Sequence, residues 1–193
     1  MKKVLVVVLV SVLTMGSAFA QKGTWYLGTS AMTSQKASFV TGFMFDKYDE
    51  AQTLTLGIAP DAGYFVADKF SIGLGLAFNL TSDKIDSDAD AVNTIAIGFN
   101  PYARYFMISK GNFGFYLQGG FSFVTSMVDI DGVDPVNTFY IGINPGISYS
   151  LGKHFGLTAA FGNLGYTSYN KDHDNFGLNV DMSSLKFGLS WLF

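Results

Sequence analysis

Three side chains near residue 170 are of the types that carry out nucleophilic catalysis. Ser168, His173 and Asp174 lie within seven residues of one another. A histidine that removes a serine proton and is oriented by an acid could attack a lipid ester at a membrane surface. All three fall in one polar segment, however, and not on separate elements that would hold them together. We predict no catalytic residue and no enzymatic activity, with a lipid-modifying enzyme as the less favoured alternative.

Carboxylates form the second group that could do chemistry, because oxygen ligands bind divalent cations. Thirteen of the fifteen acids lie in or beside four polar segments. These acids are Asp46, Asp49, Glu50, Asp83, Asp86, Asp88, Asp90, Asp129, Asp131, Asp134, Asp172, Asp174 and Asp181. The stretch from Asp129 to Asp134 resembles part of a calcium loop but lacks the terminal Glu at the required distance. We predict neither a metal site nor a cofactor, and we interpret the acids as a solvated, repulsive surface.

Three further charges, Asp61, Arg104 and Lys186, interrupt stretches that are otherwise apolar or small. Those stretches have a period of two, which indicates β-strands. From Phe139 to Leu151 every second residue is apolar, and the residues between are small or polar. Eight strands are predicted, at residues 23–33, 53–66, 70–82, 92–107, 113–127, 137–151, 155–166 and 178–193.

The larger apolar face is too long and continuous for water, so it should face lipid while smaller residues fill a narrow interior. This predicts an all-β fold, a closed antiparallel up-and-down transmembrane β-barrel of eight strands. Connections at 67–69, 109–112 and 152–154 are tight, and the other four are longer and polar. Residues 39–45 are strand-like within the first long connection. They could extend the first hairpin, or the barrel could have ten strands.

Alternation places Asp61, Arg104 and Lys186 inside the barrel, where a cation avoids a cost of roughly 2–4 kcal/mol for facing lipid. Asp61 and Arg104 lie on alternate strands at similar depth, so they could meet across the lumen. We interpret the three charges as an ion-pair network that fills the core. A gate or a narrow ion path is the alternative.

Aromatic residues mark the end of the barrel that carries the tight turns. The residues concerned are Trp25, Tyr64, Tyr105, Tyr149 and Trp191. We predict that they form an aromatic girdle at one membrane surface, where the rings stay apolar and the polar atoms reach the headgroups.

A short sequence motif recurs three times, with Gly and then Pro preceding Tyr64, Tyr105 and Tyr149. Its prolines are Pro60, Pro101 and Pro145. Because proline cannot donate a ladder hydrogen bond, we expect a bulge or kink at each of them.

The first twenty residues are typical of a secretory signal peptide. Lys2 and Lys3 precede an apolar run, and Ala18-Phe19-Ala20 forms a cleavage site. We therefore predict a signal peptide at residues 1–20 and one barrel domain at residues 21–193. The chain has no Cys, and no later apolar run is long enough for a transmembrane helix. The net charge of −3 without a basic patch argues against nucleic-acid binding.

The signal segment, the repeated hairpin phrase, the run Gly63–Asp68 and the C-terminal Ser190-Trp191-Leu192-Phe193 resemble one known family. This is the outer-membrane protein β-barrel domain family of Gram-negative bacteria, small barrels of the type of outer membrane proteins A and X. The resemblance implies an eight-stranded monomer in the cell outer membrane, with periplasmic termini and extracellular long loops. It also implies that Phe193 is a signal to the barrel assembly machinery, and that outer-membrane lipid and lipopolysaccharide are partners.

The family includes structural proteins, adhesins, narrow pores and lipid-modifying enzymes, so the fold does not determine an activity. We expect a non-enzymatic barrel that contributes to envelope structure and displays acidic surface loops. A narrow, low-conductance pore is the alternative.

Overall fold

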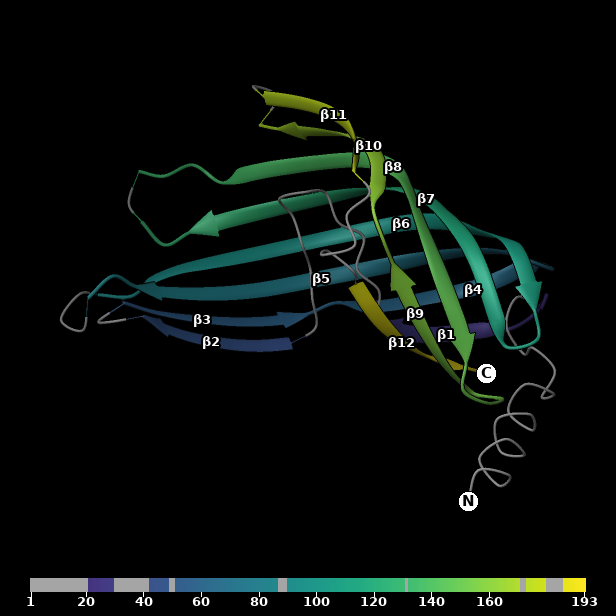
Figure 1. The fold of residues 1–193 in the computed structure, drawn as a ribbon. Helices are drawn as coiled ribbons and strands as arrows, with labels where there is room; N and C mark the ends of the chain where they lie inside the picture. Colours follow the sequence, from purple (N-terminus) through teal and green to yellow (C-terminus); the bar gives the residue numbers. More distant parts are fainter. Residues whose placement is uncertain are drawn as a thin grey trace, which may run out of the picture.

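The computed structural model describes residues 21–29, 42–48, 51–86, 90–130, 132–170, 173–179 and 186–193, and the regular elements in these ranges are all β-strands (Figure 1). The strands are β1 (Trp25–Thr29), β2 (Gly42–Tyr48), β3 (Ala51–Ile58), β4 (Pro60–Ala67), β5 (Phe70–Lys84), β6 (Val92–Lys110), β7 (Phe113–Val128), β8 (Val136–Ser150), β9 (Phe155–Ala160), β10 (Asn163–Tyr169), β11 (His173–Asn179) and β12 (Lys186–Leu192). No helix in these ranges is long and apolar enough to cross a membrane. The predicted signal peptide lies outside the described residues.

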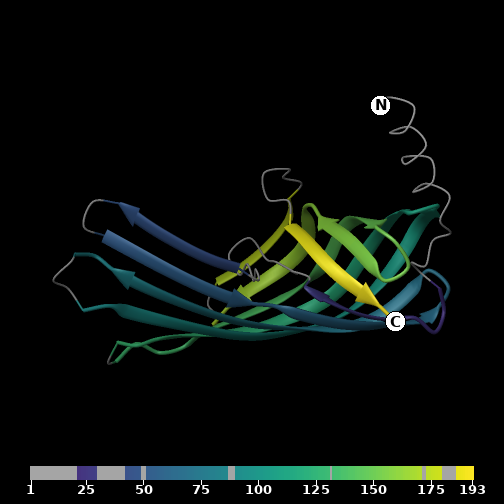
Figure 2. The same cartoon turned by 90° about the horizontal axis from the view of Figure 1, so that it is seen from below.

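Eight of the strands close into an antiparallel ring. The order around it is β1, β4, β5, β6, β7, β8, β9 and β12, and β12 pairs with β1 to complete the circle. The closing ladder joins Tyr26 to Leu192 and Gly28 to Ser190. Figure 2 shows the yellow β12 ending beside the purple β1. The predicted closed barrel of eight strands is confirmed, and the ten-stranded alternative is wrong.

We call the end of the barrel that carries the three tight turns the turn end, and the opposite end the loop end. The other four strands extend the wall at the loop end. β3 continues into β4 through Ala59 and pairs with β2, while β10 follows β9 and pairs with β8 and β11. The β2–β3 hairpin turns between the paired residues Tyr48 and Ala51. The strand-like segment at 39–45 therefore belongs, from Gly42 onward, to a longer first hairpin, and residues 42–48 of the expected long connection form a strand instead.

The two strands that form the closing ladder, β1 and β12, differ from their predicted extents. The predicted strand 23–33 is described only as far as Thr29, because residues 30–41 lie outside the described residues. The predicted strand 178–193 is divided between the end of β11 and all of β12, and residues 180–185 lie outside the described part of the chain.

An apolar belt covers the outer face of the ring. In β8, Ile141 and Ile143 are exposed while Tyr140 and Asn144 on either side of them are buried. Equivalent outward-facing stretches run over residues 54–64, 70–80, 95–105, 113–123 and 139–149, each eleven residues long. A tilted strand needs about 9–11 residues to cross the hydrocarbon core of a membrane. The belt thus has the height of a membrane-spanning surface.

Large aromatic side chains fill the ring at the turn end, although small residues were expected there. The buried cluster consists of Tyr26, Phe65, Tyr102, Phe106, Tyr116, Tyr140 and Leu192. Inward-facing glycines make room for the tyrosine rings: a Cβ atom at Gly63, Gly73 or Gly146 would collide with the ring of Tyr26, Tyr102 or Tyr116, respectively. The interior is therefore packed by rings lying across the glycines of neighbouring strands, an arrangement known to stabilise glycine-containing sheets.

The three prolines interrupt ladders mostly without changing their register. Pairing with β5 stops at Ile58 and resumes at Asp61 around Pro60, and pairing of β6 with β7 skips Pro101, with the register unchanged in both cases. At Pro145 the register toward the neighbouring β9 and β10 shifts by one residue. The expected bulge thus occurs only there. The bulges of the other two hairpins lie nearer the turns, between Phe65 and Ala67 and between Phe106 and Ile108.

Candidate functional site

A buried charge network occupies the turn-end half of the lumen. Asp61 on β4 and Arg104 on β6 point inward from strands separated by β5, as alternation predicts. The Arg104 Nη2 atom lies 3.9 Å from the Asp61 Oδ2 atom, and both side chains are at most 5% exposed. The structure therefore brings together two of the three charges that the sequence places inside the barrel.

Gln118 completes the coordination of the arginine. The Nε and Nη2 groups of Arg104 donate hydrogen bonds of 3.0 and 2.7 Å to its Oε1 atom. Gln118 stands directly opposite Arg104 in the β6–β7 ladder. Sequence reasoning missed this partner, because folding the predicted hairpin evenly about its tight turn at 109–112 places Leu117 opposite Arg104, and the bulge between Phe106 and Ile108 shifts the register.

Three tyrosines surround the same guanidinium group. Its central carbon lies 4.6 Å from the ring centroid of Tyr116, 5.2 Å from that of Tyr102 and 5.5 Å from that of Tyr26. The Tyr102 hydroxyl donates a hydrogen bond to Asp61 and lies 2.8 Å from the Tyr26 hydroxyl. Cation–π contacts and hydrogen bonds thus compensate charges that would be costly to bury alone.

Lys186, the third predicted lumen charge, begins β12, and its backbone pairs with Ala160 of β9. Its side chain lies outside the described part of the structure. Its membership of the network stays a prediction.

The five residues predicted to form the girdle all lie at the turn end. Trp25, Tyr105 and Trp191 are exposed on the outer face, and Tyr64 and Tyr149 are half-buried there. The ring centroids of Trp25 and Tyr64 are 4.7 Å apart, and His154 stacks on Trp191 at 5.5 Å. The geometry suits a membrane surface, because all five residues lie on the outer face at the turn-end edge of the apolar belt.

The C-terminal Phe193 is bound to the barrel wall through its backbone and not through its side chain. Its N–H group donates a hydrogen bond of 2.9 Å to the carbonyl of Trp25, while the side chain is 64% exposed. The aromatic ring therefore remains accessible, and its role as an assembly signal stays a prediction.

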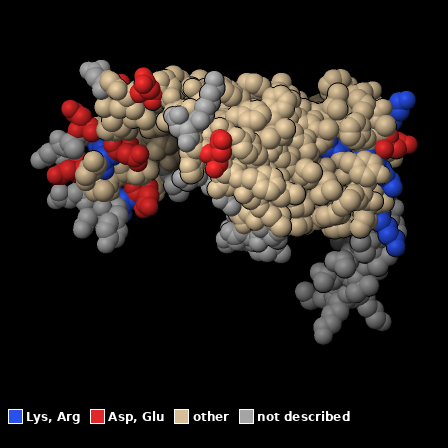
Figure 3. All heavy atoms as spheres, turned by 90° about the horizontal axis from the view of Figure 1, so that it is seen from above, with Lys and Arg blue, Asp and Glu red and all other residues tan. Residues whose placement is uncertain are grey.

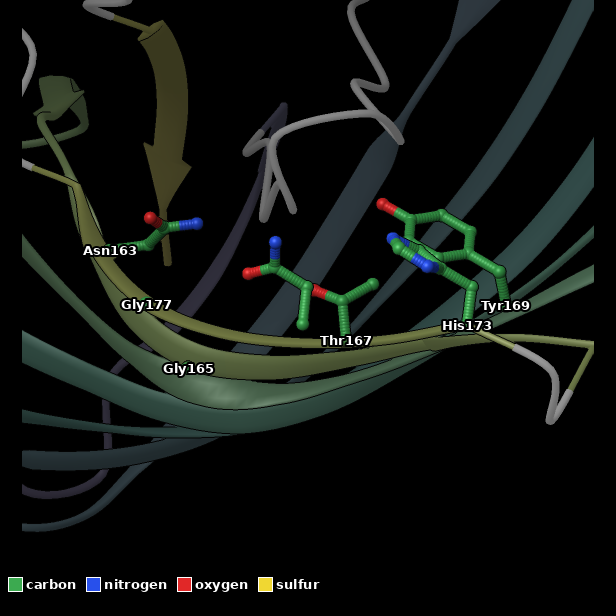
Figure 4. Close-up of a pocket in the computed structure, with 7 residues that line it drawn as sticks. Asn163, Gly165, Thr167, Tyr169, His173 and Gly177 are labelled. Carbon is green, nitrogen blue, oxygen red and sulfur yellow. The ribbon is translucent and has the colours of Figure 1, made fainter.

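A polar hollow lies on the inner face of the β10–β11 hairpin, at the loop end (Figure 4). Its volume is about 100 Å³, and it is lined by Asn163, Gly165, Thr167, Tyr169, His173, Asn175 and Gly177. Tyr169 and His173 form one end of the hollow, with ring centroids 5.9 Å apart. Apart from the paired glycines Gly165 and Gly177, every lining side chain offers a polar atom, so the hollow can hold water or a small polar molecule.

The three residues considered for catalysis do not assemble. His173 pairs with Tyr169, whereas Asp174 pairs with Ser168 one position away in the same hairpin. Because successive side chains of a strand point to opposite faces, His173 lies inside the hollow while Ser168 and Asp174 lie on the outer face. There the Ser168 and Tyr166 hydroxyls donate hydrogen bonds to Asp174. The histidine thus has neither the serine nor the acid on its own face of the sheet.

Acidic residues gather at the loop end, as Figure 3 shows. Those in the described ranges are Asp46, Asp83, Asp86, Asp90, Asp129, Asp134 and Asp174. The described ranges contain no group of three or more His, Cys, Asp or Glu residues arranged to hold a metal ion. Asp131, in the calcium-loop-like stretch, lies outside them, as do Asp49, Glu50, Asp88, Asp172 and Asp181.

A family model described as the outer membrane protein beta-barrel domain matches residues 5–193. No curated protein matches the chain.

Proposed function

Since the chain belongs to the outer membrane protein beta-barrel domain family, we propose that it is a non-enzymatic structural barrel of the outer membrane. In this proposal the tight turns and both termini face the periplasm, and the acidic loop end faces the medium. Outer-membrane lipid and lipopolysaccharide surround the apolar belt, and the barrel assembly machinery inserts the chain by way of Phe193. The ring is complete within one chain, which favours a monomer.

The filled lumen is the observation that carries this proposal. Arg104, Asp61, Gln118 and the three tyrosines around them are each at most 5% exposed. An ion crossing the barrel would have to displace these side chains and leave buried charges unpaired, which costs several kcal/mol. Eight strands leave an interior only wide enough for side chains. The interior therefore supports a structural role better than a conducting one.

The opposite placement of His173 and Ser168 supports the non-enzymatic part of the proposal. A serine nucleophile needs its base within about 2.6–3.2 Å, often somewhat more in an unliganded site. Two side chains on opposite faces of one sheet do not reach that distance without refolding the hairpin. The acidic loop end is then a surface for contact with the medium.

One reconstitution experiment tests the proposal against both alternatives. The purified barrel is inserted into planar bilayers for single-channel recording, and the lipid of the same sample is analysed for hydrolysis or acyl transfer. We expect no discrete conductance steps and unchanged lipid. Conductance steps that change in the Arg104→Ala variant would establish a pore. Lipid turnover by the wild type that is lost in His173→Ala would establish an enzyme.

A further inference from the structure

Each tight turn of the barrel carries one lysine. Lys69 lies between β4 and β5, Lys110 ends β6, and Lys153 lies between β8 and β9. A fourth, Lys22, precedes β1. All four side chains are exposed, and Figure 3 shows blue side chains at the turn end, opposite the acidic loop end.

The charge of this rim is positive. Among the described side chains there, only Asp68 opposes the four lysines, and its Oδ1 atom accepts a hydrogen bond of 3.0 Å from the backbone N–H of Lys22. Four positive charges and one negative charge leave +3. At the loop end, the seven described aspartates exceed Lys47 and Lys84 by five charges. The barrel is therefore electrically polar along its axis.

The turns hold the lysines in fixed places. The Lys69 carbonyl accepts a hydrogen bond of 2.8 Å from Phe106, and Lys69 itself has a φ of 65°, which closes the turn. Gly111, next to Lys110, has a φ of 57°. The exposed rings of Trp25, Tyr105 and Trp191 lie at the same end of the outer face. The lysine stems thus start beside the aromatic girdle, at the depth where lipid headgroups lie.

We propose that these four lysines form a binding rim for anionic phospholipid headgroups in the leaflet that surrounds the turn end. The inference rests on the proposed placement of the barrel in a membrane but not on its direction. The lysines recur at every second strand of the ring and do not cluster on one side. Such a circle matches many separate phosphates in a lipid surface, whereas a single polyanion would be matched by one continuous patch.

The chain provides its own probe for a test, because Trp25 and Trp191 are its only tryptophans and both lie at this rim. The folded barrel is placed in phosphatidylcholine vesicles that contain equal fractions of either brominated phosphatidylglycerol or brominated phosphatidylcholine. Bromine quenches tryptophan fluorescence on contact. We expect the anionic lipid to be preferred by about fivefold, the factor for one lysine near an anionic surface, and the preference to fall in 0.5 M salt.

Two variants with the same change of charge locate the effect. Lys69→Gln/Lys110→Gln should reduce the preference to less than half, and Lys47→Gln/Lys84→Gln at the loop end should leave it intact. Equal quenching of the wild type by the two lipids would overturn the proposal without any variant. So would an equal loss of preference in both variants. Both leaflets of these vesicles have the same composition, so the quenching result does not depend on the direction in which the barrel is inserted. The result is also independent of the bilayer recordings that test the structural role.

Discussion

Replacing Arg104 by methionine tests the buried network most directly. Methionine keeps much of the apolar stem but removes the guanidinium group. Asp61 then loses an ion pair of 3.9 Å, and Gln118 loses hydrogen bonds of 3.0 and 2.7 Å. The variant leaves a carboxylate buried among tyrosine rings without its cation.

The expected loss follows from these distances. Two unit charges 3.9 Å apart attract each other by about 4 kcal/mol at an effective dielectric constant of about 20. In the wild type the cost of burying both charges offsets part of that attraction. In Arg104→Met the cost for Asp61 remains and the attraction is lost, and removing one partner of a buried pair costs about 3–5 kcal/mol. We expect the free energy of unfolding to fall by that amount.

Urea unfolding in phosphatidylcholine vesicles, followed by tryptophan fluorescence, measures this loss. The Asp61→Asn/Arg104→Met double variant should lose less than the sum of the two single variants, because the unpaired charge is gone. Lys153→Met, an exposed turn position, should change the free energy by no more than about 0.5 kcal/mol. A loss below about 1 kcal/mol in Arg104→Met, or strict additivity in the double variant, would show that Asp61 and Arg104 do not stabilise the barrel as a pair.

Three other predictions concern the packing, the closure and the loops. Gly73→Ala should lower the free energy of unfolding by about 1–3 kcal/mol through its collision with Tyr102, whereas Gly75→Ala, where the nearest atom would be 3.7 Å away, should not; equal urea midpoints would contradict this. In the Leu27→Cys/Trp191→Cys variant a disulfide can join paired residues of β1 and β12, so the oxidised variant should keep a compact gel mobility after boiling. The control variant Leu27→Cys/Phe99→Cys, with its cysteines on strands that do not pair, should not. Calorimetry with Ca²⁺ should show no saturable heat, since the Asp129–Asp134 stretch lacks the Glu that completes a calcium loop; a saturable isotherm that Asp129→Asn abolishes would show a site.

The period-two pattern was sufficient to place the ring and its two central charges. Asp61 and Arg104 could be assigned to the interior because a one-residue slip would turn every side chain of a strand to the other face. Information of this kind is local, and a single sequence contains it. The exact partner of Arg104 was not within reach, because the bulge between Phe106 and Ile108 shifts the register by one residue and brings Gln118 opposite Arg104.

The tyrosine core was harder to foresee. Tyr26, Tyr102 and Tyr116 occupy inward positions, but tyrosine suits both a lipid boundary and a packed interior, so its type alone does not decide. The decisive contacts join rings to glycines on neighbouring strands, as Tyr102 to Gly73. The longer first hairpin was only one of the alternatives for residues 39–45, for a related reason. Asp46 and Lys47 resemble loop residues, although strands that rise beyond the belt tolerate charge.

The ladder that closes the ring has a consequence for how the barrel forms. Within the described residues, β1 meets β12 only from Tyr26–Leu192 to Gly28–Ser190, whereas the β6–β7 hairpin is paired from Thr94–Val128 to Lys110–Phe113. Hairpins form early because their partners are near in sequence, while contacts between distant residues must first overcome a larger loop entropy. The β1–β12 pairing should therefore be the last step of folding and the first to break. Changes to Leu27 or Ser190 would alter the rate at which the inserted barrel closes more than the order in which its hairpins appear.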